Sequence, residues 1–156
     1  MERITTGEGI PNWIRPDIEK ERGEIARVAK EFLGKEPSEA IIQEIIRILD
    51  EAPIMELSDE DWALLENTDS FHDIRPGHIE DAEGITTTYN QELPSENKRD
   101  FQGLLKAFSR GNPMQAPTIL KNDQGKLHLV SGNTRLMIAR ALKMRPKVII
   151  GEVSKM

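Results

Sequence analysis

Apolar side chains recur every three or four residues in five stretches of the chain, and this spacing predicts five helices. Their expected ranges are 17–33, 38–52, 58–65, 98–110 and 135–143. Ser38 and Ser58 stand where they can cap two of these helices, and Gly34 and Gly111 follow two others as stop signals. The isoleucine-rich face of residues 41–49 is wide enough that the first helix or a partner subunit must cover it, so a homodimer is one interpretation.

Short apolar runs predict strands over 53–57, 117–120, 127–130 and 147–153. The second and third run flank a turn at Asn122–Gly125 and therefore predict a hairpin. Glycines, prolines and acids dominate two other segments. Residues 1–16 are expected to form a mobile or extended arm, which Trp13 and Ile14 could anchor. Residues 67–97 are expected to be mainly loop, with one short strand near Ile85–Tyr89. The whole pattern predicts an α+β fold.

A chain of 156 residues without cysteine is long enough to bury a core without disulfide or metal cross-links. The missing cysteines exclude thiolate zinc sites, cysteine nucleophiles and disulfide chemistry. No signal sequence and no run of 18 apolar residues is found, so we expect a cytoplasmic protein of a bacterial or phage-infected host cell.

Charge is distributed unevenly along the chain. Residues 1–97 hold 9 Lys and Arg against 24 Asp and Glu, a net charge of −15, whereas residues 98–156 hold 12 against 3, a net charge of +9. Together with the arm, this division predicts three parts: residues 1–16, an acidic helical and loop portion over 17–97, and a basic domain over 98–156. Two interpretations remain open, an interface between the oppositely charged halves and an anion site in the basic half.

The junction between the predicted strand 127–130 and the following helix carries the most informative residues. The first backbone amides of a helix lack internal partners and can bind an anion. Gly132 lets a ligand approach the backbone, Ser131 and Thr134 offer hydroxyl groups, and Arg135 can contact a phosphate through two hydrogen bonds. Capping alone could also account for Ser, Gly, Asn and Thr at such a corner.

The last third of the chain resembles the ParB/sulfiredoxin superfamily. The resemblance covers about residues 98–153 and rests on Leu104–Phe108, Gly111, Gln115–Ile119, Leu127–Arg135 and Ala139–Leu142. It implies a small mixed sheet with packed helices and a Gly-x-x-Arg turn that holds nucleotide phosphates. On this basis Ser131, Gly132, Asn133, Thr134 and Arg135 would bind phosphate. The chain as a whole is similar to the small ParB-like proteins of bacteriophages, which implies a phage origin.

Two departures from the superfamily pattern limit what the resemblance implies. Sulfiredoxins carry a reactive cysteine in this turn, and its absence excludes their chemistry. Partition proteins carry a second arginine where this chain has Leu136, and no helix-turn-helix is evident after residue 153. On the resemblance we expect nucleotide binding, with phosphotransfer or nucleotide hydrolysis as the activity, and a nucleoside triphosphate or diphosphate with Mg²⁺ as the implied ligands.

A phosphotransferase needs a carboxylate that accepts a proton or holds Mg²⁺. The candidates are Glu66 and Asp69, with Asp73 nearby, although a solvated turn explains the same residues. The histidines offer less. His72 and His78 lie near several acids, but their spacing fits no compact metal site, so no metal-ligating residues are predicted. His128, on the strand before the turn, is a candidate for ligand contact.

A second hypothesis is a non-enzymatic modulator that binds nucleic acid or a host protein. Its nucleic-acid form draws on a basic cluster: Arg140, Lys143, Arg145 and Lys147. Its protein form draws on the acidic half, which could compete for a basic surface.

Overall fold

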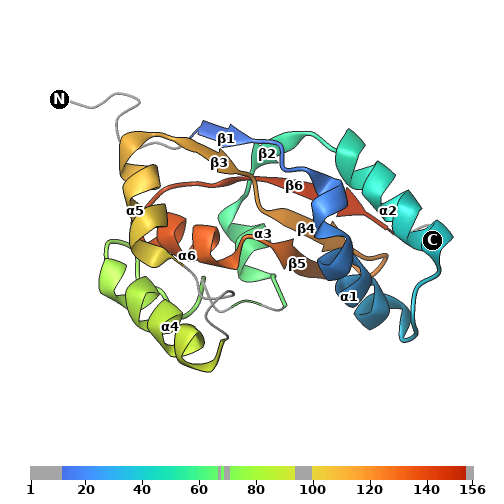
Figure 1. The fold of residues 1–156 in the computed structure, drawn as a ribbon, viewed down its shortest axis with the longest axis horizontal. Helices are drawn as coiled ribbons and strands as arrows, with labels where there is room; N and C mark the ends of the chain where they lie inside the picture. The colour runs from blue at the N-terminus through green and yellow to red at the C-terminus, as the bar shows by residue number, and fades with distance from the viewer. Residues whose placement is uncertain (1–11, 67, 69–70, 94–99, 154–156) are drawn as a thin grey trace.

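A four-stranded sheet ordered β2-β6-β4-β5 lies at the centre of the structure (Figure 1). The structure is a computed structural model, and it describes residues 12–66, 68, 71–93 and 100–153. The strands of this sheet are β2 (Ile54–Glu56), β4 (Thr118–Lys121), β5 (Leu127–Ser131) and β6 (Lys147–Glu152). The predicted hairpin is confirmed, because β4 and β5 pair antiparallel. β6 runs parallel to β4 and antiparallel to β2, so a strand from the acidic segment completes the sheet of the basic segment.

A second, smaller sheet consists of β1 (Asn12–Ile14) and β3 (Pro113–Gln115), which pair in parallel. β1 belongs to the segment that the sequence assigns to an arm, and residues 1–11 of that arm lie outside the described part of the chain. The Trp13 ring meets the buried Phe108 ring edge to face, with the ring centroids 5.6 Å apart. This contact anchors β1 to the helix that precedes β3.

The helices follow the predicted order, with one addition. They are a 3₁₀ turn η1 (Ile18–Glu21), α1 (Arg22–Leu33), α2 (Glu39–Glu51), α3 (Asp59–Ala63), α4 (Ile79–Glu92), α5 (Phe101–Arg110) and α6 (Asn133–Ala141). Both predicted serine caps are confirmed. The Ile41 N–H donates to Ser38 Oγ at 3.2 Å, and the Asp61 N–H donates to Ser58 Oγ at 3.0 Å.

The predicted strand at Ile85–Tyr89 is wrong, because these residues lie in α4. The β-branched residues of this segment favour a strand locally. In the fold, however, Ala82 and Thr86 lie one helical turn apart and are both buried, and α4 packs against α6. Tertiary packing therefore outweighs local preference in a segment that was expected to be mainly loop.

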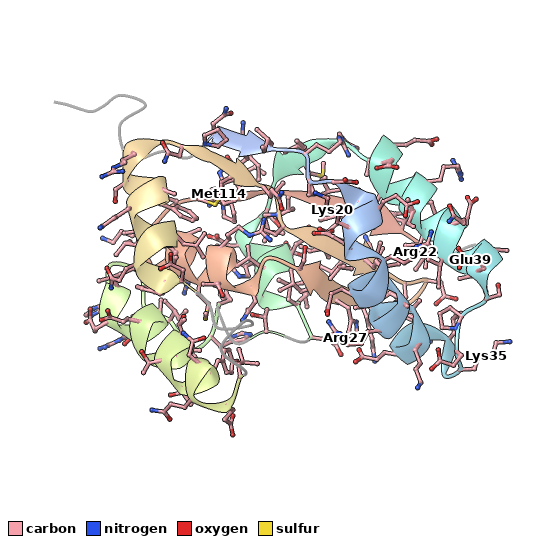
Figure 2. The ribbon with its side chains drawn as sticks, viewed as in Figure 1. Lys20, Arg22, Arg27, Lys35, Glu39 and Met114 are labelled. Carbon is pink, nitrogen blue, oxygen red and sulfur yellow. The ribbon has the colours of Figure 1, made fainter. Side chains whose placement is uncertain are left out.

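Helices cover both faces of the central sheet (Figure 1). α1 and α2 pack on one face, where Leu120 and Ile149 join their apolar residues in one core. α6 covers the opposite face, where Ile119 and Val148 belong to a second core. The ion pair between Arg22 and Glu39, with 2.5 Å between Nη1 and Oε2, joins α1 to α2 (Figure 2). The covering of the isoleucine face by the first helix is thus shown.

Within the described ranges, no helix has the length and apolar character needed to cross a membrane.

Candidate functional site

A cavity of about 680 Å³ opens where β5 ends and α6 begins. Four helices and one strand contribute to it. Its lining residues are Glu24 and Arg27 of α1, Tyr89 and Glu92 of α4 with the adjacent Leu93, Leu104 of α5, Leu129–Ser131 of β5, and Gly132–Arg135 at the start of α6. Its volume lies in the range typical of small-molecule sites, about 300–1,000 Å³.

The α6 N-terminus forms one wall of this cavity. Gly132 is the N-cap residue and has a φ of 107°, a left-handed conformation that favours glycine. Because the N-cap residue is a glycine, it offers no side-chain acceptor to the first N–H groups of the helix. These N–H groups point out of the helix end, at the positive end of the helix dipole. Such an end favours an anionic group.

Two arginines add positive charge to the walls. Arg135 is half-buried and donates from Nη1 to the Gln115 carbonyl oxygen on β3. Burial lowers the pKa of the Arg135 guanidinium, and the nearby Glu21 carboxylate opposes this shift. Arg27 is held along α1 between Glu24, 2.7 Å from its Nη2, and Glu31, 3.7 Å from its Nη1. Both guanidinium groups are thus fixed by neighbours before any ligand arrives.

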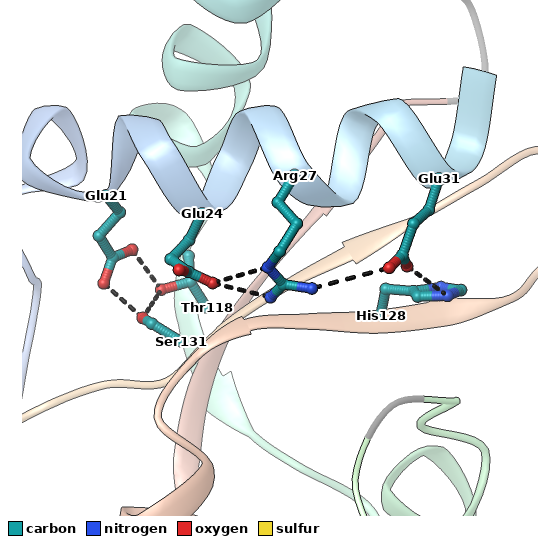
Figure 3. Close-up of polar contacts among 7 residues, drawn as sticks. All are labelled: Glu21, Glu24, Arg27, Glu31, Thr118, His128 and Ser131. Carbon is teal, nitrogen blue, oxygen red and sulfur yellow. Dashed lines mark hydrogen bonds and ion pairs between the residues drawn. The ribbon is translucent and has the colours of Figure 1, made fainter. Parts of the chain in front are cut away.

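A carboxylate and two hydroxyl groups meet beside the turn (Figure 3). Glu21, at the end of η1, accepts a hydrogen bond from Thr118 Oγ1 at 2.6 Å on one carboxylate oxygen and one from Ser131 Oγ on the other. The two hydroxyl oxygens lie 3.1 Å apart. Thr118 is fully buried, whereas Ser131 is half-buried and lines the cavity.

A bulge in β5 brings Ser131 to this cluster. Ile119 pairs with Leu129, but Thr118 pairs with Ser131, so Val130 is an extra residue on β5. Side chains alternate between the faces of a regular strand, and a bulge shifts that alternation by one residue. The extra residue therefore places Ser131 on the α1 face of the sheet together with Thr118.

The structure brings all five residues of the predicted phosphate turn into this one cavity. The structure does not place the predicted catalytic carboxylates in the cavity lining. Glu66 is exposed, its N–H donates to the Leu127 carbonyl oxygen at 2.9 Å, and its side chain is not among the described residues that line the cavity. Asp69 lies outside the described part of the chain. The segment nevertheless reaches the turn, because Thr68 Oγ1 contacts Asn133 Oδ1.

The histidines lie elsewhere. α1 covers His128: its Nε2 is 3.4 Å from Glu31 Oε2, and its ring meets that of Phe32 edge to face, with centroids 4.7 Å apart. His128 does not appear among the described cavity residues. His78 Nδ1 contacts Glu80 Oε1 at 2.8 Å, and His72 Nε2 contacts the Ala63 carbonyl oxygen at 3.2 Å. Over the residues the structure describes, no three His, Asp or Glu side chains gather as a metal cluster.

Sequence reasoning missed several residues of the site. Arg27, Tyr89 and Glu92 line the cavity, and Glu21 contacts Ser131 beside it. All four lie far along the chain from the turn. Arg27 had a local signal, since its spacing from Glu24 and Glu31 predicts a row of charges on one helix face. No local signal places that face over β5, and Tyr89 was assigned to a strand.

Comparisons with protein-family models, curated proteins and solved structures found no match to this chain. Any function must therefore be argued from the geometry of the cavity itself.

Proposed function

We propose that this protein binds a nucleotide, with a phosphate group at the α6 N-terminus. The observation that carries the proposal is the open start of α6 in the wall of a cavity that also holds Arg27 and Arg135. Backbone N–H groups, a helix dipole and guanidinium groups are the donors that proteins use for phosphate. The resemblance of residues 98–153 to the ParB/sulfiredoxin superfamily supports the same assignment.

The remaining walls suit a nucleoside. Tyr89 supplies an aromatic ring, and Leu93, Leu104 and Leu129 supply apolar surface. Bases stack on aromatic side chains, and apolar surface shields a bound base from water. A cavity that combines guanidinium groups with an aromatic ring and apolar surface favours a phosphate ester with a flat ring over inorganic phosphate.

Mg²⁺ fits this proposal as a companion of the nucleotide. Mg²⁺ at phosphate sites is commonly held by one or two carboxylates together with the phosphate oxygens and water. Glu92 lines the cavity and offers a carboxylate for that role, whereas the Glu24 carboxylate, which also lines the cavity, is paired with Arg27. Transfer or hydrolysis of a phosphoryl group in the cytoplasm of a bacterial or phage-infected cell is the activity to be tested.

The first experiment is calorimetric titration of the folded full chain with ATP, ADP, CTP and GTP, each with and without Mg²⁺. We expect at least one nucleotide to bind. Arg27→Gln and Arg135→Gln should each weaken binding about 10- to 100-fold, because a charge-assisted hydrogen bond contributes roughly 1.5–3 kcal/mol. The absence of binding across the panel, in a sample shown to be folded, would refute the proposal.

Arg47→Gln is the matched control for Arg27→Gln. Arg47 lies on α2 between Glu44, three residues before it, and Glu51, four residues after it, as Arg27 lies between Glu24 and Glu31. Arg47 is outside the cavity lining. Equal loss of affinity in the two variants would mean that general charge, rather than the cavity, determines binding.

A further inference from the structure

The Glu21, Thr118 and Ser131 cluster has the parts of an activated hydroxyl nucleophile. An activated serine needs a base within hydrogen-bond reach and a further group that orients that base. Ser131 Oγ donates to one oxygen of Glu21, and Thr118 Oγ1 donates to the other at 2.6 Å (Figure 3). Each hydroxyl group has a single proton to donate. Because both hydroxyl groups donate to Glu21, neither has a proton left to donate to the other.

The two hydroxyl groups differ in access. Thr118 is fully buried between β5 and β6, whereas Ser131 lines the cavity and directly precedes Gly132, the N-cap of α6. Ser131 is therefore adjacent in sequence to the first amides of α6, and a phosphate held by these amides would lie next to its hydroxyl group. Thr118 can only hold the Glu21 carboxylate in place.

The bulge in β5 is a second feature that places Ser131 beside Thr118 and Glu21. If β5 had no bulge, Thr118 would pair with Val130, and Ser131 would face away from α1. Bulges of this kind occur next to active sites, where they redirect a side chain. Glu21 reaches the same point from a different part of the chain, 110 residues earlier.

Building on the proposed nucleotide site, we propose that Ser131 is a phosphoryl acceptor and that Glu21 is its general base. The donor is a nucleoside triphosphate. The Ser131 Oγ–P bond forms as the bond between the γ-phosphorus and the β–γ bridging oxygen breaks. The hydroxyl proton passes to Glu21, and a nucleoside diphosphate leaves. The products are phosphoserine at position 131 and the diphosphate.

The test uses the full chain and the nucleoside triphosphate among ATP, CTP and GTP that binds in calorimetry, labelled at its γ-phosphate and supplied with Mg²⁺. Peptide mapping by mass spectrometry should find one phosphoryl group, on Ser131. Ser131→Ala should abolish this labelling. Glu21→Gln should slow it about 100-fold or more, the contribution typical of a general base, while the affinity for a non-hydrolysable analogue stays within about twofold.

Two control variants separate chemistry from folding. Ser109→Ala changes an exposed serine on α5, and Glu44→Gln changes a glutamate on α2, both outside the described cavity lining, so both should label at the wild-type rate. Thr118→Val should slow labelling, and Thr118→Ser should restore it, because a positioning residue needs only its hydroxyl group. Equal slowing in Thr118→Val and Thr118→Ser would assign Thr118 a packing role and overturn its positioning role.

The outcomes distinguish this inference from the nucleotide site on which it rests. Nucleotide binding without label on Ser131, or label that persists in Ser131→Ala, would overturn the phosphoryl acceptor and leave nucleotide binding intact. Failure of every nucleotide to bind would overturn both. A Glu21→Gln variant that labels at the wild-type rate would overturn the role of Glu21 as base.

Discussion

Gly132 and Pro117 approach so closely that a Cβ added to Gly132 would lie 2.6 Å from the Cβ of Pro117. Real Cβ atoms do not come this near to other atoms, so the pair fixes how the α6 N-terminus meets the start of β4. The glycine is thus required by the fold, whether or not a ligand approaches the turn. Substitutions of Gly132 therefore report on the architecture of the site rather than on ligand contact.

Gly132→Ala should destabilise the protein by about 2–5 kcal/mol. A left-handed conformation costs an L-residue roughly 1–2 kcal/mol, and overpacking against Pro117 adds about 1–3 kcal/mol. Urea unfolding measures the change. Gly125→Ala is the control, because Gly125 has a φ of 79° but open space around it, so only the conformational part should appear. Equal losses in the two variants would contradict the close contact with Pro117.

Local signals were sufficient to predict the elements that obey them. Ser38 and Ser58 cap helices because their side chains reach amides three residues ahead, an interaction that depends on nothing distant. The hairpin at Asn122 follows for the same reason: the Asn122 side chain accepts from the N–H groups of Gln124 and Lys126 inside the turn. The helix that contains Tyr89 could not be predicted in this way, because α4 forms through its packing against α6 and not through a local signal.

The candidate site also has one part that local signals could predict and one part that they could not. The turn from Ser131 to Arg135 could be found from the sequence, since a glycine between a strand and a helix has a local physical meaning. The approach of Glu21 could not, because it depends on the bulge at Val130 and on how α1 crosses the sheet. Neither feature leaves a periodic trace in the sequence.

Arg15→Met should destabilise the fold by about 1–2 kcal/mol. The Arg15 guanidinium donates to the carbonyl oxygens of Leu49 at 3.0 Å and Ala52 at 2.5 Å, and so closes the C-terminal end of α2. A cation there supplies donors to the last carbonyl groups of the helix, of which that of Leu49 has, among the described residues, only a 3.3 Å backbone bond from the Ala52 N–H, and it interacts favourably with the helix dipole. Urea unfolding of Arg15→Met beside Arg47→Met tests this. Within the described part of the chain, Arg47 makes only exposed ion pairs on one helix, so a loss at Arg47 as large as that at Arg15 would contradict the prediction.

Acid should reduce stability partly through Asp81. Hydrogen bonds from the Arg75 side chain, and a further one from the Arg75 N–H, hold the pKa of Asp81 well below its usual range. A carboxylate with a lowered pKa stabilises the folded state fully above its ordinary pKa of about 4, and this contribution is lost as the pH falls through its folded pKa. Asp81→Asn should therefore be less stable than wild type at pH 7, and the difference should narrow below about pH 4.

Urea midpoints measured for wild type and Asp81→Asn between pH 7 and pH 2.5 check this expectation. Arg75→Gln removes the other partner and should reproduce the same narrowing. A difference between Asp81→Asn and wild type that stays constant down to pH 2.5 would show that Arg75 does not perturb the titration of Asp81.

Lys143→Gly should stabilise the protein by about 0.5–1 kcal/mol. Lys143 follows the end of α6 with a φ of 62°, the left-handed conformation that commonly ends a helix and that glycine adopts most readily. The Met144 N–H donates to the Ala139 carbonyl oxygen at 2.8 Å, and the Lys143 N–H donates to that of Arg140 at 3.1 Å, so the helix end forces this conformation on a lysine. Relief of about 1–2 kcal/mol of strain exceeds the greater chain entropy of glycine in the unfolded state. Thermal and urea unfolding measure the gain.

Lys106→Gly, inside α5, is the control, and it should lower the free energy of unfolding by about 1 kcal/mol. A Lys143→Gly variant less stable than wild type would mean that the contacts of the lysine side chain outweigh the strain at this helix end.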